Sequence, residues 1–303
     1  WQRTVYSPLS SGTISVQPSW FQQHLEQTPT VSRFDLDGTS IHYRHWKNQG
    51  KPGLLLVHGH AAHAHWWDFI APAFIDEYDV VAIDLSGSGD SDHRRKYSAR
   101  LFAEEIVACI DDARLKHPVV AGHSFGGSMT RVAAYLFPTR IDAAILIDSA
   151  IPTRKSHRTP PPMPRGRERY YASLEEGMRR FRLRPAQPCA NQYIRDYIAS
   201  QSLRHTDQGY CFKLDGAVFA RMPAEENLPV AAEMIQSLKI PVGLIYGEQS
   251  KFFPKEFLTY LEGIIDKDLI TGIPDAHHHV FLDQPLPFIE ALANMLKRIR
   301  ARA

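Results

Sequence analysis

One serine stands in a setting that favours nucleophilic chemistry. The stretch Gly122-His123-Ser124-Phe125-Gly126 follows a short apolar run, 119–121, and precedes a helical pattern that extends to about residue 137. A sharp strand-to-helix turn strains its middle residue, so the residues two before and two after it must be small. The following helix presents free backbone N–H groups to developing negative charge. The spacing therefore predicts that Ser124 is a nucleophile raised clear of a sheet.

A nucleophilic serine needs an imidazole that takes its proton and later returns it. Histidines are concentrated in an early group at positions 58, 60, 63 and 65 and in a late run at 277–279. Metal binding is the alternative for both groups, and an expression remnant is a further alternative for the late one. No carboxylate is interleaved in the early group, and the late run is internal. We therefore expect no metal site, with His63 and His65 lining a pocket or facing solvent.

The stretch Leu54-Leu55-Leu56-Val57-His58-Gly59-His60, together with the serine turn, resembles the α/β-hydrolase superfamily. The resemblance implies an oxyanion hole built from the backbone N–H groups of His60 and Phe125. Two fixed donors of this kind contribute about 3 kcal/mol each to transition-state stabilisation in comparable sites. The segment from Asp84 to Asp92 resembles the turn after the next strand of the family, and we expect Asp84 to be structural.

The family places its general base late in the chain, after the last strand. The usual pattern is a histidine followed by an acidic residue five positions later and a proline seven positions later. His278 fits both requirements, with Asp283 and Pro285, whereas His277 and His279 do not. The resemblance therefore assigns the role of base to His278.

The acid that orients the base departs from the family pattern. Most relatives carry an aspartate three residues after a glycine that ends the strand following the insertion, and this chain has Ser250 there. Two substitutes remain. Asp148 ends an earlier strand, where some branches of the superfamily place the acid, and Glu248 lies two residues short of the usual position. We favour Asp148 and keep Glu248 as the alternative.

The elements that must position these residues follow a repeating rhythm. A predicted β-hairpin surrounds Asp37-Gly38, and short β-rich runs then alternate with helical patterns, as expected for buried parallel strands in βα units. The predicted strands are 54–57, 80–83, 119–121, 143–147, 241–246 and 268–273, and the predicted helices are 66–75, 101–115, 125–137, 254–265 and 286–299. The fold class is α/β, with a mostly parallel, doubly wound sheet.

The alternation of strand and helix patterns is interrupted over residues 151–235. This segment fits the place and length of the helical cap that relatives insert. We expect an N-terminal arm at 1–30, a main domain at 31–150 and 236–303, and the cap between its two parts. The region 154–184 has ten Lys or Arg residues against three Glu. It is a solvated basic surface, or its arginines bind an anionic group of the substrate. The proline-rich stretch 160–164 is a candidate hinge or lid.

The amino-acid composition limits the classes of partner and the cellular location that the protein is expected to have. Hydrophobic residues make up 44% and charged residues 22%, as in ordinary globular proteins, and the net charge of +2 argues against nucleic-acid binding. Three cysteines cannot form a complete disulfide framework, which indicates reduced thiols and a cytoplasmic location. We find no apolar run long enough to span a membrane. The chain begins with Trp1, so export by a removed leader stays open. The sequence makes no prediction of oligomeric state.

The expected reaction is hydrolysis of a small or medium carboxylic ester through an acyl-enzyme, without metal or organic cofactor. Lactonase, thioesterase, amidase and carbon–carbon bond hydrolase activity use the same machinery and remain alternatives. Epoxide hydrolases and dehalogenases are disfavoured, because they need a carboxylate where this chain has Ser124. A receptor that binds a small molecule without turnover is the rival from a different class.

Overall fold

The computed structural model describes residues 17–154, 169–223 and 226–302. Its strands are β1 (Thr30–Leu36), β2 (Thr39–Trp46), β3 (Pro52–Val57), β4 (Asp79–Ile83), β5 (Lys116–His123), β6 (Ala143–Ile147), β7 (Leu203–Thr206), β8 (Gly209–Phe212), β9 (Val242–Gly247) and β10 (Ile270–Ile273). Its α-helices are α1 (Ser19–Glu26), α2 (Ala99–Asp112), α3 (Phe125–Leu136), α4 (Leu174–Arg180), α5 (Gln192–Gln201), α6 (Ala231–Ser237), α7 (Lys255–Leu261), α8 (Val280–Asp283) and α9 (Pro285–Arg300). Short 3₁₀ helices are η1 (Ala64–Trp67), η2 (Ala71–Phe74), η3 (Phe219–Arg221) and η4 (Lys267–Leu269).

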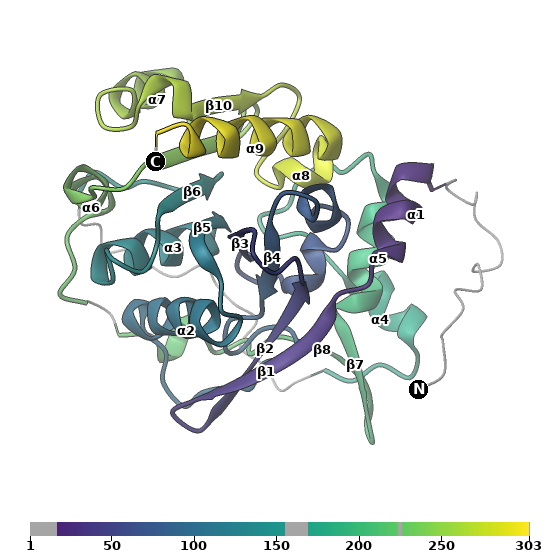
Figure 1. Ribbon diagram of the computed structural model, residues 1–303. Coiled ribbons are helices and arrows are strands. Elements are labelled where there is room, and N and C mark those ends of the chain that lie inside the picture. The colour runs from purple at the N-terminus through teal and green to yellow at the C-terminus, as the bar shows by residue number, and fades with distance from the viewer. Residues whose placement is uncertain (1–16, 155–168, 224–225, 303) are drawn as a thin grey trace.

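Eight strands form one sheet in the order β1-β2-β4-β3-β5-β6-β9-β10 (Figure 1). The pairs from β4 to β10 are all parallel, and β2 is antiparallel to both of its neighbours. The predicted mostly parallel, doubly wound sheet is therefore confirmed. Because parallel strands share one carboxyl edge, the loops after β3, β4, β5, β6, β9 and β10 meet at that edge.

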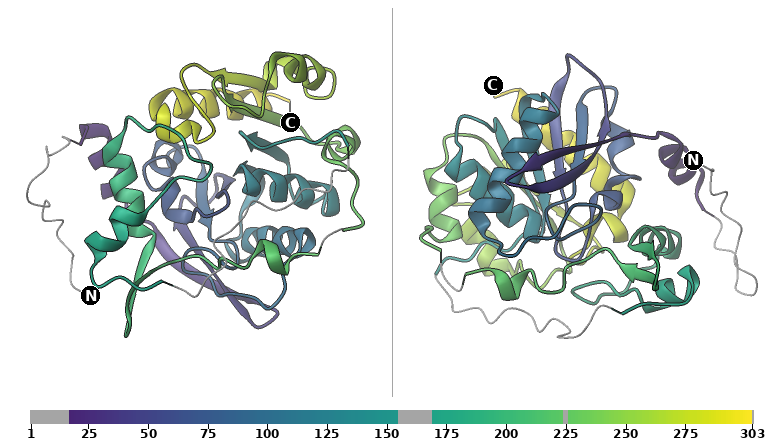
Figure 2. Two further views of the ribbon diagram at one scale, coloured as in Figure 1. Left: turned by 180° about the vertical axis from the view of Figure 1, so that it is seen from behind. Right: turned by 90° about the horizontal axis from the view of Figure 1, so that it is seen from below.

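The central strands are apolar throughout because both faces of the sheet are covered. Every residue of β4 and of β6 is buried. Along β3, Leu54 and Leu56 belong to one apolar cluster, and Leu55 and Val57 belong to the other. Helices α2 and α3 pack on the second cluster and α9 on the first, on opposite sides of the sheet (Figure 2). This packing, rather than helix propensity alone, holds the layers together.

The segment between β6 and β9 contains α4, α5, α6 and η3, and it also contains a hairpin. Strands β7 and β8 pair antiparallel, and Gly209 at the turn has a φ of 115°. The sequence indicated helical stretches and no strong strand here, and it did not identify this hairpin, because its strands are only four residues long and mix polar with apolar side chains. The predicted hinge at 160–164 lies outside the described residues.

Two further expectations differ locally. Within the predicted N-terminal arm, Ser19–Glu26 forms α1, whose Phe21 is fully buried against Phe69 and Tyr193. The predicted helix 66–75 is instead two 3₁₀ turns, η1 and η2. Pro72 at the start of η2 has no N–H to donate to a preceding carbonyl, so a continuous α-helix would lose a hydrogen bond there.

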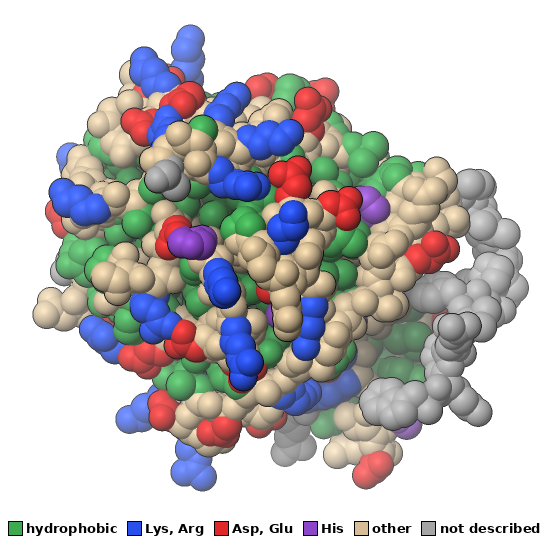
Figure 3. All heavy atoms as spheres, viewed as in Figure 1, with side chains coloured by type: hydrophobic (Ala, Val, Ile, Leu, Met, Phe, Trp, Pro, Cys, Tyr) green, Lys and Arg blue, Asp and Glu red, His purple; other side chains and the backbone are tan. Residues whose placement is uncertain are grey.

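The surface carries mixed charge. On the face shown in Figure 3, basic and acidic side chains both occur among apolar and neutral ones, as the small net charge leads one to expect. None of the helices in the three described ranges combines the length and apolarity needed to cross a bilayer.

Gly126 allows α3 to approach the end of β3. A Cβ atom at this position would lie 2.3 Å from the carbonyl oxygen of His58 and 2.7 Å from that of Val57. Both obstacles are backbone atoms, which cannot rotate away as a flexible side chain can. The first turn of α3 therefore depends on a glycine where helix propensity alone favours alanine.

We expect Gly126→Ala to lower the free energy of unfolding by about 2 kcal/mol, because overpacking outweighs the gain in helix propensity of about 1 kcal/mol. Urea unfolding measures the change. The control is Gly216→Ala, where nothing lies within 4 Å of the added Cβ; its effect should stay within about 0.5 kcal/mol. Equal effects of the two substitutions would show that close approach at Gly126 is not limiting.

Candidate active site

Ser124 occupies a strained turn between β5 and α3. Its φ is 53° and its ψ is −115°, which is a costly conformation for a residue with a side chain. Its backbone N–H donates to the carbonyl oxygen of Ile147 at 2.8 Å, which ties the turn to the end of β6. A Cβ at Gly122 would lie 2.5 Å from the oxygen of Gly126. The small residues on both sides of Ser124 are thus a geometric requirement of the turn.

The structure brings Ser124, His278 and Asp148 together. Nε2 of His278 lies 2.9 Å from Oγ of Ser124, and Nδ1 of His278 lies 2.7 Å from Oδ1 of Asp148. A carboxylate accepts hydrogen bonds, so His278 donates its Nδ1–H to Asp148 and leaves the Nε2 lone pair facing the serine hydroxyl. This is the tautomer that general-base catalysis requires.

Asp148 is completely buried at the end of β6, and its carboxylate is held by further donors. Gly247 donates its backbone N–H to Oδ2 at 2.9 Å, and Ser250 donates its hydroxyl to Oδ1 at 2.8 Å. Ser250, which occupies the usual position of the acid, therefore orients Asp148 instead. Glu248 is exposed, and its Oε1 lies beside Gly272. Between the two sequence candidates, Asp148 is the one in contact with His278.

The two predicted oxyanion residues flank Ser124. Phe125 is the first residue of α3, where a backbone N–H has no intrahelical acceptor. The His58–His60 loop lies directly on the turn, since a Cβ at Gly59 would be 3.3 Å from Cβ of Ser124. The His60 ring lies 6.4 Å from the Phe125 ring. Burial, followed by the charge of Arg184, lowers the pKa of His60 to about 4, so its ring is neutral at neutral pH.

The early histidines have separate roles in the fold. His58 accepts a hydrogen bond from the Leu85 backbone N–H at Nε2. Nε2 of His63 lies 2.8 Å from Oγ of Ser202, and the side chain is buried. The expectation that His63 faces solvent is therefore wrong. His65 is paired with Asp68 at 2.7 Å. His58, His63 and His65 thus have different hydrogen-bond partners in the fold.

Asp84 supports the loop that carries His60. Its carboxylate accepts hydrogen bonds from Nδ1 of His42 at 2.7 Å and from the backbone N–H groups of Ala64 and Asp90. Burial alone would raise the pKa of Asp84, but the hydrogen bond and charge of His42 outweigh it and lower that pKa. The structure therefore agrees with a structural role for this residue.

The loop that carries His278 is tied to the insertion. Gln187 accepts the backbone N–H of His279 at 2.8 Å and donates its side-chain amide to Asp283 at 2.9 Å. Asp283 also accepts the backbone N–H of His277 at 2.7 Å. Asp283, the acidic residue that identified His278 as the base in the sequence, thus holds the loop that carries His278 in place. No sequence signal identified Gln187, because its partners lie over 90 residues away.

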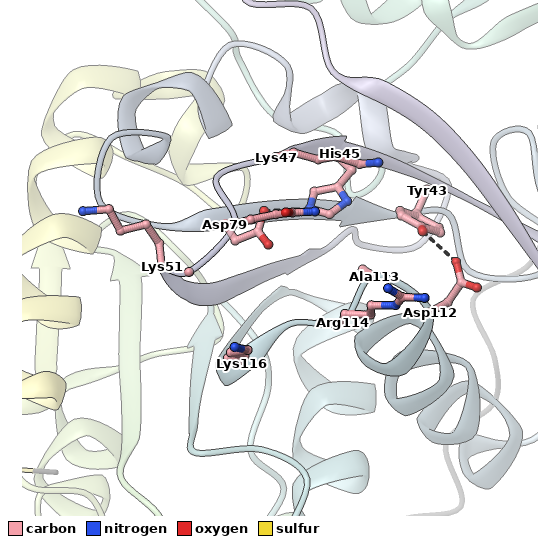
Figure 4. A pocket seen from close by; sticks show the side chains of 11 residues that line it. Tyr43, His45, Lys47, Lys51, Asp79, Asp112, Ala113, Arg114 and Lys116 are labelled. Atoms are coloured by element: carbon pink, nitrogen blue, oxygen red, sulfur yellow. Dashed lines mark hydrogen bonds and ion pairs between the residues drawn. The ribbon is translucent and has the colours of Figure 1, made fainter.

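A separate cavity of about 380 Å³ lies at the opposite, amino end of the parallel strands. Its charged lining is partly neutralised: Asp79 is paired with His45, and Asp112 accepts the Tyr43 hydroxyl (Figure 4). Lys47, Gln49, Gly50, Lys51, Ala113, Arg114 and Lys116 complete the lining. None of its lining residues is Ser124, His278 or Asp148, so this cavity is distinct from the candidate active site.

Comparisons with known proteins agree with the architecture. The family model for the alpha/beta hydrolase fold matches residues 52–209. The uncharacterized hydrolase YugF of Bacillus subtilis is 24% identical over 282 residues, which cover 90% of this chain and all of that protein. The thioesterase domain from the curacin biosynthetic pathway is 21% identical, with a TM-score of 0.71 over 88% of this chain and 99% of that domain. An esterase from Mycobacterium tuberculosis is 20% identical, with a TM-score of 0.69 over 92% and 97%.

We expect Asp84→Asn to lower the free energy of unfolding by about 3 kcal/mol at pH 7, because the substitution leaves buried donors without a carboxylate. The native pKa of Asp84 is depressed, so its contribution is full above the unfolded-state pKa of about 3.9 and is lost as the pH falls below it. Urea unfolding between pH 7 and pH 3 should show the gap between wild type and variant beginning to narrow below about pH 4.

Asp92→Asn is the matched control, because Asp92 is exposed and its carboxylate accepts one hydrogen bond, from the Ser40 backbone. Its effect should stay within about 0.5 kcal/mol at every pH. A gap for Asp84→Asn that does not depend on pH would contradict the electrostatic explanation.

Proposed function

The chain belongs to the alpha/beta hydrolase fold family, and on that premise we propose that it is a serine hydrolase that cleaves a carboxylic ester through an acyl-enzyme. The observation that carries the proposal is the continuous hydrogen-bonded chain from Ser124 through His278 to Asp148. Its members come from three loops at one edge of the sheet, and a merely structural contact would not require the strained backbone at Ser124.

The proposed reaction begins when Nε2 of His278 takes the proton of the Ser124 hydroxyl. The serine oxygen attacks the ester carbonyl, and the tetrahedral oxyanion receives hydrogen bonds from the N–H groups of His60 and Phe125. His278 then gives its proton to the leaving alcohol. A water molecule then loses a proton to the same nitrogen and attacks the acyl-enzyme. The carboxylic acid leaves, and His278 returns the proton to the Ser124 oxygen. Neither step requires a metal or an organic cofactor.

Asp148 is proposed to hold His278 in the productive tautomer and to stabilise the imidazolium that forms during each step. Three donors reach its carboxylate: the His278 ring, the Gly247 backbone and the Ser250 hydroxyl. Together they fix both oxygens, so Asp148 has little freedom to turn away from the base. This preorganisation supports the choice of Asp148 over the exposed Glu248.

We further propose that residues 151–235 act as a cap over a main domain formed by 31–150 and 236–303. Support comes from Gln187, which bonds the base loop, and from Ser202, which bonds His63 next to the oxyanion loop. The ring of Phe181 lies 6.5 Å from that of Trp66. Among the basic residues of 154–184, those at 155, 158, 165 and 167 lie outside the described residues. Arg184 is close enough to His60 for its charge to lower the pKa of that histidine. This proximity supports the hypothesis that an arginine of this region binds an anionic group of the substrate.

A fluorophosphonate probe tests the proposal, because it labels only a serine whose oxygen is activated as a nucleophile. We expect the wild-type protein to be labelled and Ser124→Ala to be unlabelled. His278→Ala should slow labelling by at least about 10²-fold, the usual contribution of a general base. Labelling is measured by intact-protein mass spectrometry.

Ser128→Ala is the control, since Ser128 lies one turn along α3 and bonds Ser149 rather than His278. It should be labelled as fast as the wild type. Folded wild-type protein that resists the probe would favour the receptor instead. Ser124, His278 and Asp148 could cleave several bond types. Relative rates on a panel of p-nitrophenyl esters, thioesters and lactones then show which bond type the protein prefers.

The choice of acid has its own test. We expect Asp148→Asn to lower kcat/KM for p-nitrophenyl acetate by about 10³–10⁴-fold, because an amide favours the wrong tautomer of the base. Glu248→Gln should change kcat/KM by less than about twofold, since that carboxylate is exposed and away from His278.

A rescue variant makes the test independent of folding. Because Ser250 lies 2.8 Å from Oδ1 of Asp148, a carboxylate introduced there can reach the base. Asp148→Asn combined with Ser250→Asp should recover at least about tenfold of the lost activity. If Glu248→Gln is the more damaging single substitution, Asp148 is not the acid.

A further inference from the structure

Three buried imidazoles gather beside Ser124 from two distant parts of the chain. His123 ends β5, and His278 and His279 follow β10. Their ring centroids are 4.8, 5.0 and 5.4 Å apart, and one ring nitrogen of each lies within 4.8 Å of the others. All three side chains are at most 5% exposed. Such a cluster in a closed environment can act as a set of ligands.

Two of the three histidines already hold the tautomer of a metal ligand. His123 donates its Nε2–H to the carbonyl oxygen of His278 at 3.0 Å, so the lone pair of its ring is on Nδ1. His278 donates its Nδ1–H to Asp148, so its lone pair is on Nε2. A metal-binding histidine typically donates its other N–H to a carboxylate or a backbone carbonyl, and both partners are present here.

The nitrogens left over by this arrangement are unsatisfied. Within the described residues, Nδ1 of His123 has no hydrogen-bond partner, and the His279 ring has only a contact with the Pro185 backbone that falls outside normal hydrogen-bond geometry. Leaving a buried polar atom unpaired costs about 1–3 kcal/mol. A bound cation would supply the partner that these ring nitrogens lack.

We infer that His123, His278 and His279 form an inhibitory binding site for Zn²⁺ at the candidate active site. Zn–N bonds of about 2.1 Å at tetrahedral angles place imidazole centroids about 5 Å apart, which matches the observed spacing. The nitrogens need to close in by small ring rotations. Ser124 Oγ, which is 2.9 Å from Nε2 of His278, is available as a fourth ligand.

The proposed metal would stop catalysis without unfolding the protein. Zn²⁺ takes the Nε2 lone pair that must receive the serine proton, and the Ser124 hydroxyl becomes a ligand instead of a nucleophile. No bond is broken, so removal of the metal restores the base. The binding of zinc does not depend on the proposed hydrolase function, whereas its inhibitory effect rests on that function.

The donor set also selects the metal. Imidazole nitrogen suits Zn²⁺, Co²⁺ and Cu²⁺, whereas Mg²⁺ and Ca²⁺ prefer oxygen ligands. The other group of convergent ligand atoms in the described residues, His42, Asp84 and Asp90, is already occupied by protein partners. His42 pairs with Asp84, and Lys213 pairs with Asp90 at 2.9 Å.

Calorimetric titration of the wild-type protein with Zn²⁺ tests binding directly. We expect one tight equivalent that Mg²⁺ does not displace, and Co²⁺ in its place should give the visible absorption of a tetrahedral site. His279→Phe should weaken Zn²⁺ binding by at least about tenfold, because the loss of a ligand costs at least as much affinity as the loss of a hydrogen-bond partner of a ligand. His117→Gln, at the exposed other end of β5, is the control for surface sites and should bind as the wild type does.

Fluorophosphonate labelling with and without Zn²⁺ tests inhibition, with each variant compared against itself in the absence of metal. Zn²⁺ should suppress labelling of the wild type by at least about tenfold, EDTA should restore it, and His279→Phe should be insensitive at the same Zn²⁺ concentration. His123→Asn serves as a second ligand variant for the binding experiment, should His279→Phe fail to fold by circular dichroism.

The outcomes separate the two proposals. Zinc binding that is equally strong in wild type, His279→Phe and His123→Asn, or no tight binding at all, overturns the zinc site even if the probe labels Ser124. If both ligand variants weaken zinc binding but the probe never labels the protein, the metal site is supported and the proposed hydrolase function is wrong.

Discussion

The strained backbone of Ser124 is the constraint on which the rest of the structure depends. A positive φ at a residue with a side chain costs about 1–3 kcal/mol, and several contacts maintain it. The Ser124 N–H bonds the end of β6, Gly126 lets α3 lie against the β3 loop, and Ser149 donates its hydroxyl to the Ser124 carbonyl at 2.7 Å. Because these contacts come from the ends of β3 and β6, the turn stays strained only while the sheet and α3 are fully packed.

The same parallel sheet explains why residues so distant in sequence converge. Asp148, Ser250 and His278 follow β6, β9 and β10, and the His58–His60 loop follows β3. The carboxyl ends of parallel strands lie at one edge, so these loops meet without long excursions. Hydrogen bonds then refine their positions: Asp84 anchors the oxyanion loop, and Gln187 with Asp283 anchors the base loop. The hydrogen bonds of a few buried carboxylates and one side-chain amide hold these loops in place, and the contacts of His278 with Ser124 and Asp148 are each shorter than 3 Å.

Sequence patterns predicted the sheet and the turn that carries Ser124, because both depend on local spacing. A strand run, small residues around a turn and a helical pattern are all visible within 20 residues. The hairpin β7–β8 was missed because short, mixed strands carry little periodicity. The contacts of Ser250 with Asp148 and of Gln187 with Asp283 could not be foreseen either, because they join positions about 100 residues apart. The direction of a side chain at a sheet edge is decided by packing that no local pattern encodes.

Burial of the histidines has two opposite consequences. It removes water and lowers the pKa of His123 and His279, so the rings around the base are neutral and do not repel the imidazolium that forms on His278. The same rings, each with one nitrogen within 4.8 Å of the others, offer ligands for a borderline-soft cation. A base must expose a lone pair to accept a proton, and Zn²⁺ competes for that lone pair more strongly as more imidazoles surround it. Susceptibility to zinc is therefore a physical consequence of placing His123 and His279 beside the base, rather than an addition to the site.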